Sequence, residues 1–135
     1  MSSFTDPLKL KLVREGGGRR FELLQSFSYY TKIGGYKVIF IPSGFVTDFA
    51  SVPRIFWSIA PPVGHHTKAS VVHDYLYCKD CKYKVTRYEA DRIFLEAMKV
   101  TKTSLFTRTL YYAAVRLFGS LFFRKTKNST SNFNY

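Results

Sequence analysis

The first third of the chain alternates apolar and polar residues in the way that half-buried β-strands do. In residues 8–12 a leucine occupies every second position and a lysine fills each gap, which predicts a strand. Residues 21–30 place apolar side chains at odd positions, and residues 36–41 form an aromatic and aliphatic run, so both predict strands. Pro42 ends the last of these, because proline donates no hydrogen bond to a sheet. We therefore expect an antiparallel sheet of three or more strands.

The apolar period changes to that of α-helices after an irregular stretch punctuated by prolines. Residues 68–78 carry Ala, Val and Leu on one face and predict a helix, with Thr67 as its N-terminal cap. Thr86 and Glu89 have the spacing of a capping box, in which each side chain accepts a hydrogen bond from the other residue's backbone N–H. This box predicts a second helix over residues 87–100.

Together these elements predict an α+β fold: an antiparallel sheet in the N-terminal third, then a motif-bearing loop and about three helices packed on it. The third helix is expected over residues 104–123. A chain of 135 residues suits one domain with one core. We expect this domain to span residues 1–127, and the polar residues 128–135 to form a frayed tail.

The net charge of +12 is distributed unevenly along the chain. Residues 1–46 carry +4 and residues 47–96 carry +1, whereas residues 97–135 carry +7 and contain no acid. Such an excess suggests an anionic partner for the C-terminal third: an acidic protein, a lipid surface or the backbone of a nucleic acid. No motif that reads bases is present, so sequence-specific recognition of DNA is not expected.

Polar side chains recur every four residues in the expected third helix and form a stripe beside an apolar face. This stripe fits either the solvated edge of a docked helix or a contact surface for the anionic partner. Two arginines in the apolar stretch 103–123 argue against a transmembrane helix, since each costs about 2.5–3.5 kcal/mol at a bilayer centre. The stripe consists of Arg108, Tyr112, Arg116, Ser120 and Arg124.

Targeting and redox signals point to a reducing cytoplasm. The N-terminus has no basic region followed by an apolar one, so no secretory signal is expected. Cys78 and Cys81 are too close in the chain to staple distant elements. A zinc site built from them with His65 and His66 would lack a second Cys-x-x-Cys pair, so we expect a free or exchangeable pair of thiols.

His73 and Asp74 form a dipeptide that recurs in metal sites, because imidazole nitrogen and carboxylate oxygen suit divalent transition metals such as Zn²⁺ and Mn²⁺. Asp91 on the second helix and Asp48 on the loop are the natural further ligands. The alternative is that His73 is a hydrogen-bonded helix residue and that Asp74 pairs with a nearby arginine, Arg87 or Arg92.

Asp48, Ser51 and Arg54 recur at a spacing of three and share one side if the loop bends into a helical turn. They are the candidate catalytic residues, because polar groups between large apolar side chains need partners. Ordinary turn and cap chemistry is the alternative.

Arg87 and Asp91 are four residues apart on one helix face. An exposed ion pair at this spacing contributes only about 0.3–0.5 kcal/mol. The alternative places Asp91 in the same cleft as His73 and Asp74, with Arg87 neutralising the carboxylates or holding an anionic substrate.

Most of these residues lie in four segments: GFVTDFASVPR at residues 44–54, VVHDYLY at 71–77, RYEADRIF at 87–94 and YAAVR at 112–116. Together the segments resemble a small family of tailed-phage and prophage proteins that is catalogued only as a domain of unknown function. The resemblance implies a phage origin and a late gene, and it implies that the candidate residues belong to the motifs that define the group. It carries no established activity.

Three functional hypotheses follow. In the first, a small metal-assisted hydrolase binds a divalent cation through His73, Asp74, Asp91 and Asp48 and activates water. In the second, the same residues form a buried hydrogen-bonded network in a non-enzymatic virion or tail-assembly component. In the third, an inhibitor directed at the host binds an acidic bacterial protein. All three place the protein in the host cytoplasm, and the second also places it in the virion.

Overall fold

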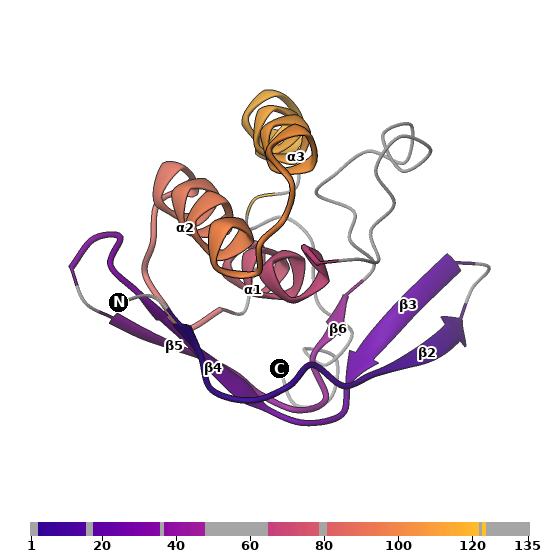
Figure 1. Ribbon diagram of the computed structural model, residues 1–135. Helices are drawn as coiled ribbons and strands as arrows, with labels where there is room; N and C mark the ends of the chain where they lie inside the picture. Colours follow the sequence, from indigo (N-terminus) through magenta and orange to yellow (C-terminus); the bar gives the residue numbers. More distant parts are fainter. Residues whose placement is uncertain are drawn as a thin grey trace.

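The computed structural model describes residues 3–15, 18–35, 37–47, 65–78, 81–121 and 123 (Figure 1). Three candidate catalytic residues, Asp48, Ser51 and Arg54, lie outside this part of the chain, as does the expected tail 128–135. Within the described residues, strands come first and helices follow, so the predicted α+β fold is confirmed.

The strands form two antiparallel sheets of three strands each rather than one continuous sheet. The first sheet has the order β1-β4-β5 and the second the order β2-β3-β6. In the first sheet, β1 spans Ser3–Phe4, β4 spans Phe27–Thr31 and β5 spans Lys37–Ile41. In the second, β2 spans Leu10–Glu15, β3 spans Gly18–Leu23 and β6 spans Val46–Thr47.

The strand expected over residues 21–30 is divided between the two sheets. Its first part belongs to β3, its last part belongs to β4, and the exposed Leu24 lies in the break. Leu23 and Phe27 are both buried, so the odd-numbered alternation continues across the break. The prediction of one strand was wrong because this alternation contains no sign of the change of sheet.

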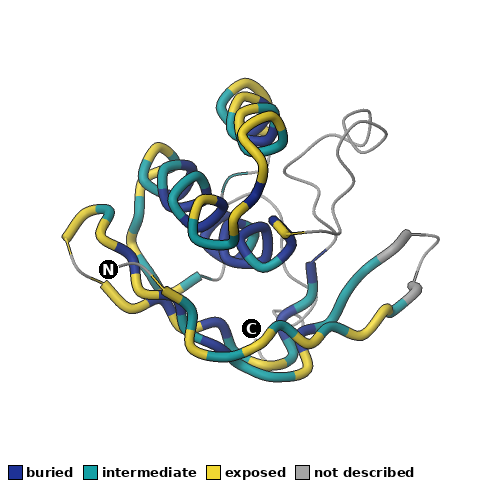
Figure 2. The backbone as a smooth tube through the Cα atoms, in the orientation of Figure 1, coloured by how far each residue is buried: buried dark blue, intermediate teal, exposed yellow. Residues whose placement is uncertain are grey.

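The pair β4 and β5 has one buried and one exposed face, as the alternation predicts. Tyr29 and Ile39 are paired in register and both are completely buried. The next pair along, Tyr30 and Val38, faces solvent. The buried face lies under the helices, and Figure 2 shows that the buried parts of strands and helices meet between these layers.

The described residues form three α-helices, of which α1 (Thr67–Tyr77) is the central one. Only Lys68 and Asp74 of its eleven residues are not buried, because α1 contacts α2, β5 and β6. The residue that caps α1 is His66, whose side chain makes no capping hydrogen bond, so the prediction of Thr67 as cap was wrong. Thr67 is instead the first helical residue and is buried.

Helix α2 (Arg87–Val100) begins and ends where the sequence predicts. The capping box is present, with the Thr86 hydroxyl accepting from Glu89 N and the Glu89 carboxylate accepting from Thr86 N, both at 3.0 Å. Helix α3 (Leu105–Phe118) is shorter than expected, because the chain passes into a 3₁₀ turn over Gly119–Leu121. No helix in the described part of the chain is both long and apolar enough to cross a membrane.

Replacing Thr86 with alanine is expected to lower the free energy of unfolding by about 1 kcal/mol, because the N–H of Glu89 loses its partner. Urea unfolding followed by circular dichroism measures this loss. Thr109→Ala, at an exposed position of α3, is the matched control and should lower stability less. Equal losses for the two variants would show that the box does not stabilise α2.

Candidate functional site

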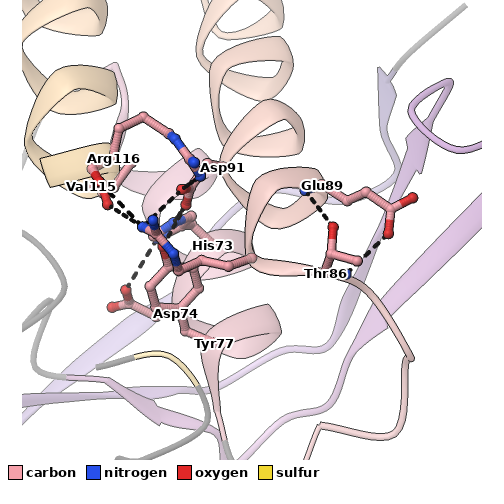
Figure 3. A network of polar contacts seen from close by, with 9 residues as sticks. His73, Asp74, Tyr77, Thr86, Glu89, Asp91, Val115 and Arg116 are labelled. Atoms are coloured by element: carbon pink, nitrogen blue, oxygen red, sulfur yellow. Dashed lines mark hydrogen bonds and ion pairs between the residues drawn. The ribbon is translucent and has the colours of Figure 1, made fainter. Parts of the chain in front are cut away.

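Asp91 on α2 is completely buried and lies at the centre of a polar network (Figure 3). Its Oδ1 accepts hydrogen bonds from His73 Nε2 at 2.9 Å and from the Tyr77 hydroxyl at 2.5 Å. Its Oδ2 accepts from Arg116 Nη1 at 2.6 Å, and Arg87 Nη1 lies 3.6 Å from the same oxygen. Each carboxylate oxygen therefore has two neighbours that donate hydrogen bonds or carry positive charge.

Local helix geometry explains how these partners converge. His73 and Tyr77 are four residues apart on α1, and Arg87 and Asp91 are four apart on α2, so each pair shares a helix face. Arg116 comes from the last turn of α3. The network therefore connects all three described helices through one carboxylate.

His73 is held by ring contacts as well as by its nitrogens. Its ring centroid lies 4.1 Å from that of Tyr77 and 4.5 Å from that of Phe94. Its Nδ1 lies 3.8 Å from Asp74 Oδ1, while its Nε2 contacts Asp91. Burial lowers the pKa of His73, but the hydrogen bonds and negative charges of Asp74 and Asp91 outweigh it and leave the pKa raised. The imidazolium, with both nitrogens protonated, is the form that suits two carboxylates.

Asp91 is ionised in this arrangement. Burial raises the pKa of its carboxyl group, but hydrogen bonds from His73, Tyr77 and Arg116 outweigh burial and hold that pKa below its usual range. Burial, followed by the hydrogen bond to Asp91, raises the pKa of Tyr77 far above its usual range. Tyr77 therefore remains a neutral hydroxyl donor.

Asp74 lies at the edge of the network that faces β6. Its side chain is 11% exposed, and the Thr47 hydroxyl donates a hydrogen bond to Oδ2. Thr47 is the last described residue before Asp48. The end of β6 therefore lies directly beside Asp74.

Arg87 and Arg92, which we predicted as alternative partners of Asp74, make other contacts. Arg87 Nη1 donates to the carbonyl oxygen of Val115 at 3.0 Å, besides its ion pair with Asp91. Arg92 donates to the hydroxyl of Tyr88 at 2.9 Å. Arg87 and Asp91 form an ion pair four residues apart, and Asp91, which is completely buried, also contacts His73.

Sequence reasoning missed three residues of this network. Arg116 belongs to the expected basic stripe, yet it turns inward to Asp91 and its guanidinium lies 5.3 Å from the ring of Tyr88. Tyr77 could have been found, because it follows His73 by one helical turn. Gly119 is buried where a Cβ would collide with the Tyr77 hydroxyl and lie 3.1 Å from Arg87 Nη1.

No cluster of three or more His, Cys, Asp or Glu side chains suited to a metal ion occurs in the described part of the chain. Both ring nitrogens of His73 face carboxylates, so a metal would have to displace one of these contacts. Asp48, the further ligand expected from the loop, lies outside the described residues. Cys78 is buried and Cys81 is half-buried. The zinc or manganese site therefore stays a prediction.

A family model described as "Protein of unknown function (DUF1353)" matches residues 21–115. The chain belongs to this family. The match runs from β3 to the last turn of α3, and it includes His73, Tyr77, Arg87 and Asp91. Arg116 is the first residue beyond it. The buried carboxylate and three of its four partners thus lie inside the DUF1353 region.

One relative is a protein of Sinorhizobium fredii (strain NBRC 101917 / NGR234) that carries the name "Uncharacterized protein y4jT". It is 34% identical over 110 residues, which are 79% of this chain and 31% of the relative. The chain therefore spans less than a third of this relative's length. No solved structure matches the chain.

Stability is expected to fall as the pH rises above 6.5, because the pKa of His73 is raised above this ordinary value in the folded protein. The contribution of the imidazolium is complete below the ordinary pKa of 6.5 and is lost as the pH passes the raised value. At the acid end, stability falls below the ordinary carboxyl pKa of 3.8, as the pH passes the lowered value of Asp91.

Urea unfolding at a series of pH values measures both losses. His73→Gln should remove the loss above pH 6.5, whereas His65→Gln, at an exposed position, should retain it. The same slope in wild type and in His73→Gln would contradict the assignment of an imidazolium.

Gly119→Ala is expected to destabilise the protein by about 1–3 kcal/mol, because its Cβ collides with the hydroxyl of Tyr77. Ser120→Ala, one residue further along, should have little effect. Tyr77→Phe removes the hydroxyl, so Gly119→Ala should cost less in that background than in wild type. Additive losses in this double-mutant cycle would mean that Gly119 and Tyr77 act independently.

Proposed function

We propose that this protein is a non-enzymatic component of a phage particle or of its tail assembly, and that it docks on an acidic partner protein through α3. In this proposal the network around Asp91 is structural: it holds α3 on the rest of the protein. The outer face of α3 is the contact surface.

The observation that carries the proposal is that the network is closed. The side chains of His73 and Asp91 are 1% and 0% exposed, so no substrate reaches them without a rearrangement. Both nitrogens of His73 and both oxygens of Asp91 already contact protein groups. A general base or a metal ligand needs an available lone pair on the reacting atom. This arrangement supports a structural role for His73 and Asp91.

The outer face of α3 supports docking because it is apolar and exposed. Phe106 and Leu117 are 64% and 73% exposed, and Ala113 between them is exposed as well. With the half-buried Leu110 they recur at spacings of four, three and four, which is the pattern of a helix that packs on another helix. We name this set, Phe106, Leu110, Ala113 and Leu117, the outer stripe.

Charge favours an acidic occupant of the outer stripe. Residues 105–121 contain no acid, and because Arg116 pairs with the buried Asp91, Arg108 is the arginine of α3 left to face a partner. A second copy of this chain would bring like charges together, whereas an amphipathic helix with acidic flanks would neutralise them. The apolar spacing also favours a helix over the backbone of a nucleic acid. We therefore assign an acidic amphipathic helix of a partner protein to this surface.

The phage origin in this proposal rests on the four sequence segments that resemble tailed-phage and prophage proteins. A late gene product of that kind is made in the host cytoplasm and then joins the particle. The third hypothesis, an inhibitor of an acidic host protein, uses the same surface of α3. The two differ in where the partner is found, and this makes them separable by experiment.

Copurification tests this proposal in cells that produce the phage or prophage encoding the chain. A tagged wild-type protein is expected to copurify with particles or assembly intermediates on a density gradient. Phe106→Ser with Leu117→Ser removes the exposed apolar groups and should lower that recovery at least about tenfold.

Leu12→Ser with Leu24→Ser changes two exposed leucines elsewhere and should leave the recovery unchanged. Wild-type protein that is absent from every phage fraction and bound to a host protein would overturn the assembly role in favour of the inhibitor.

A second candidate, metal-assisted hydrolysis, is favoured by one observation. Asp74 is partly exposed, and its partner Thr47 directly precedes Asp48 in the sequence. In this alternative, Asp74 and Asp48 would hold a divalent cation beside the buried network. Ser51 would orient a ligand, and Arg54 or Arg87 would stabilise developing negative charge.

Titration with Zn²⁺ and Mn²⁺ distinguishes the two candidates. Neither ion is expected to raise the melting temperature, because a metal at His73 must first break a contact with Asp74 or Asp91. A saturable rise that Asp74→Asn and Asp48→Asn each abolish, and that Glu22→Gln retains, would support the hydrolase and overturn the non-enzymatic proposal.

A further inference from the structure

One face of the first sheet points away from the helices (Figure 1). Exposed side chains of β4 and β5 share a face in the register of these strands. Tyr30, Val38 and Phe40 are 43%, 47% and 41% exposed. Their neighbours along the strands, such as Tyr29 and Ile39, are buried on the opposite face. We name Tyr30, Val38 and Phe40 the aromatic platform.

The register of β4 and β5 places the two rings of the platform close together. Tyr30 is paired with Val38, and Phe40 is paired with Ser28, so the rings occupy diagonal positions on one face. Diagonal positions in an antiparallel pair are about 7–8 Å apart. Two neighbouring bases of one nucleic-acid strand can each stack on one of these rings.

Lysines lie around the platform. The segment after α1 runs beside β5, where Phe40 N donates a hydrogen bond to the Tyr83 hydroxyl at 2.8 Å. Lys82 Nζ lies 5.6 Å from the ring centroid of Tyr83 and 6.0 Å from that of Phe40. Lys84, in the same segment, and Lys32, at the end of β4, are also exposed.

The elements that form this surface contain no acid. Residues 23–47 and residues 81–86 have lysines but neither Asp nor Glu, and the Glu89 carboxylate lies beside Gly34 and Lys37 at the turn between β4 and β5. Glu96, which approaches the sheet from α2, accepts hydrogen bonds from Tyr29 and Thr31 on the buried face. The exposed face is therefore positively charged and suits a polyanion.

We propose that the aromatic platform binds single-stranded nucleic acid. Every base has a flat face that can stack on an exposed ring, and lysines beside the rings neutralise the phosphates. Bases in a duplex are paired and stacked on one another, so a platform of this kind favours unpaired strands. The surface is separate from the outer stripe on α3, and the inference does not depend on the docking proposed for that stripe.

Fluorescence anisotropy tests the inference, with labelled oligo(dT) and oligo(U) of about 15 nucleotides, a length that covers one binding site. A duplex of equal length is the comparison. At least one single strand is expected to bind at least about tenfold more tightly than the duplex, and the two strands distinguish DNA from RNA.

Variants distinguish stacking of bases on the two rings from electrostatic attraction between lysines and phosphates. Tyr30→Ser and Phe40→Ser should each weaken binding at least about fivefold, whereas Tyr30→Phe and Phe40→Tyr keep a ring and should retain it. Lys82→Ala with Lys84→Ala should reduce the slope of log affinity against log salt by about 1.4. The outer-stripe variant, Phe106→Ser with Leu117→Ser, should bind as wild type does.

Three results would overturn the inference. The first is no binding to either strand, and the second is equal affinity for strand and duplex. The third is binding that depends on Lys82 and Lys84 but is unchanged in both serine variants, which would show attraction of charge without stacking.

Discussion

A carboxylate without access to water must find its counter-charges inside the protein, and Asp91 sets this requirement for the three described helices. Its two oxygens contact His73 and Tyr77 of α1, Arg87 of its own helix and Arg116 of α3. Removing one partner from a buried ion pair costs about 3–5 kcal/mol, because the remaining charge stays buried. The helices therefore depend on one another through a single side chain, and Gly119 leaves the space that this convergence requires.

The same requirement shapes the surfaces of the molecule. Because Arg116 turns inward, the exposed part of α3 is more apolar than a basic stripe would be, and Phe106 and Leu117 dominate it. The aromatic side chains Tyr30 and Phe40 are exposed on the face of β4 and β5 opposite to the buried Tyr29 and Ile39. The buried network joins α1, α2 and α3, whereas the aromatic platform belongs to β4 and β5.

Local features of the sequence predicted much of this fold. Thr86 and Glu89 form a capping box through contacts only three residues apart, so their spacing alone placed the start of α2. The sequence also suggested that His73, Asp74 and Asp91 share one location, and the structure brings them together. The sequence did not indicate that His73 and Asp91 are buried, because their burial depends on Arg116 and Phe94 from elsewhere in the chain. The break between β3 and β4 escaped prediction because the alternation continues through it.

The sequence by itself determined the element types, the helix faces of α1 and α2, and the group of acids and histidines near the middle of the chain. These follow from side-chain period and short-range hydrogen bonds, which act within a few residues. Only the tertiary structure decided that Arg116 neutralises a buried carboxylate and that Tyr30 and Phe40 share an exposed face. Both depend on which distant segments pack together, because that packing decides whether a charged or aromatic side chain is buried or exposed to water.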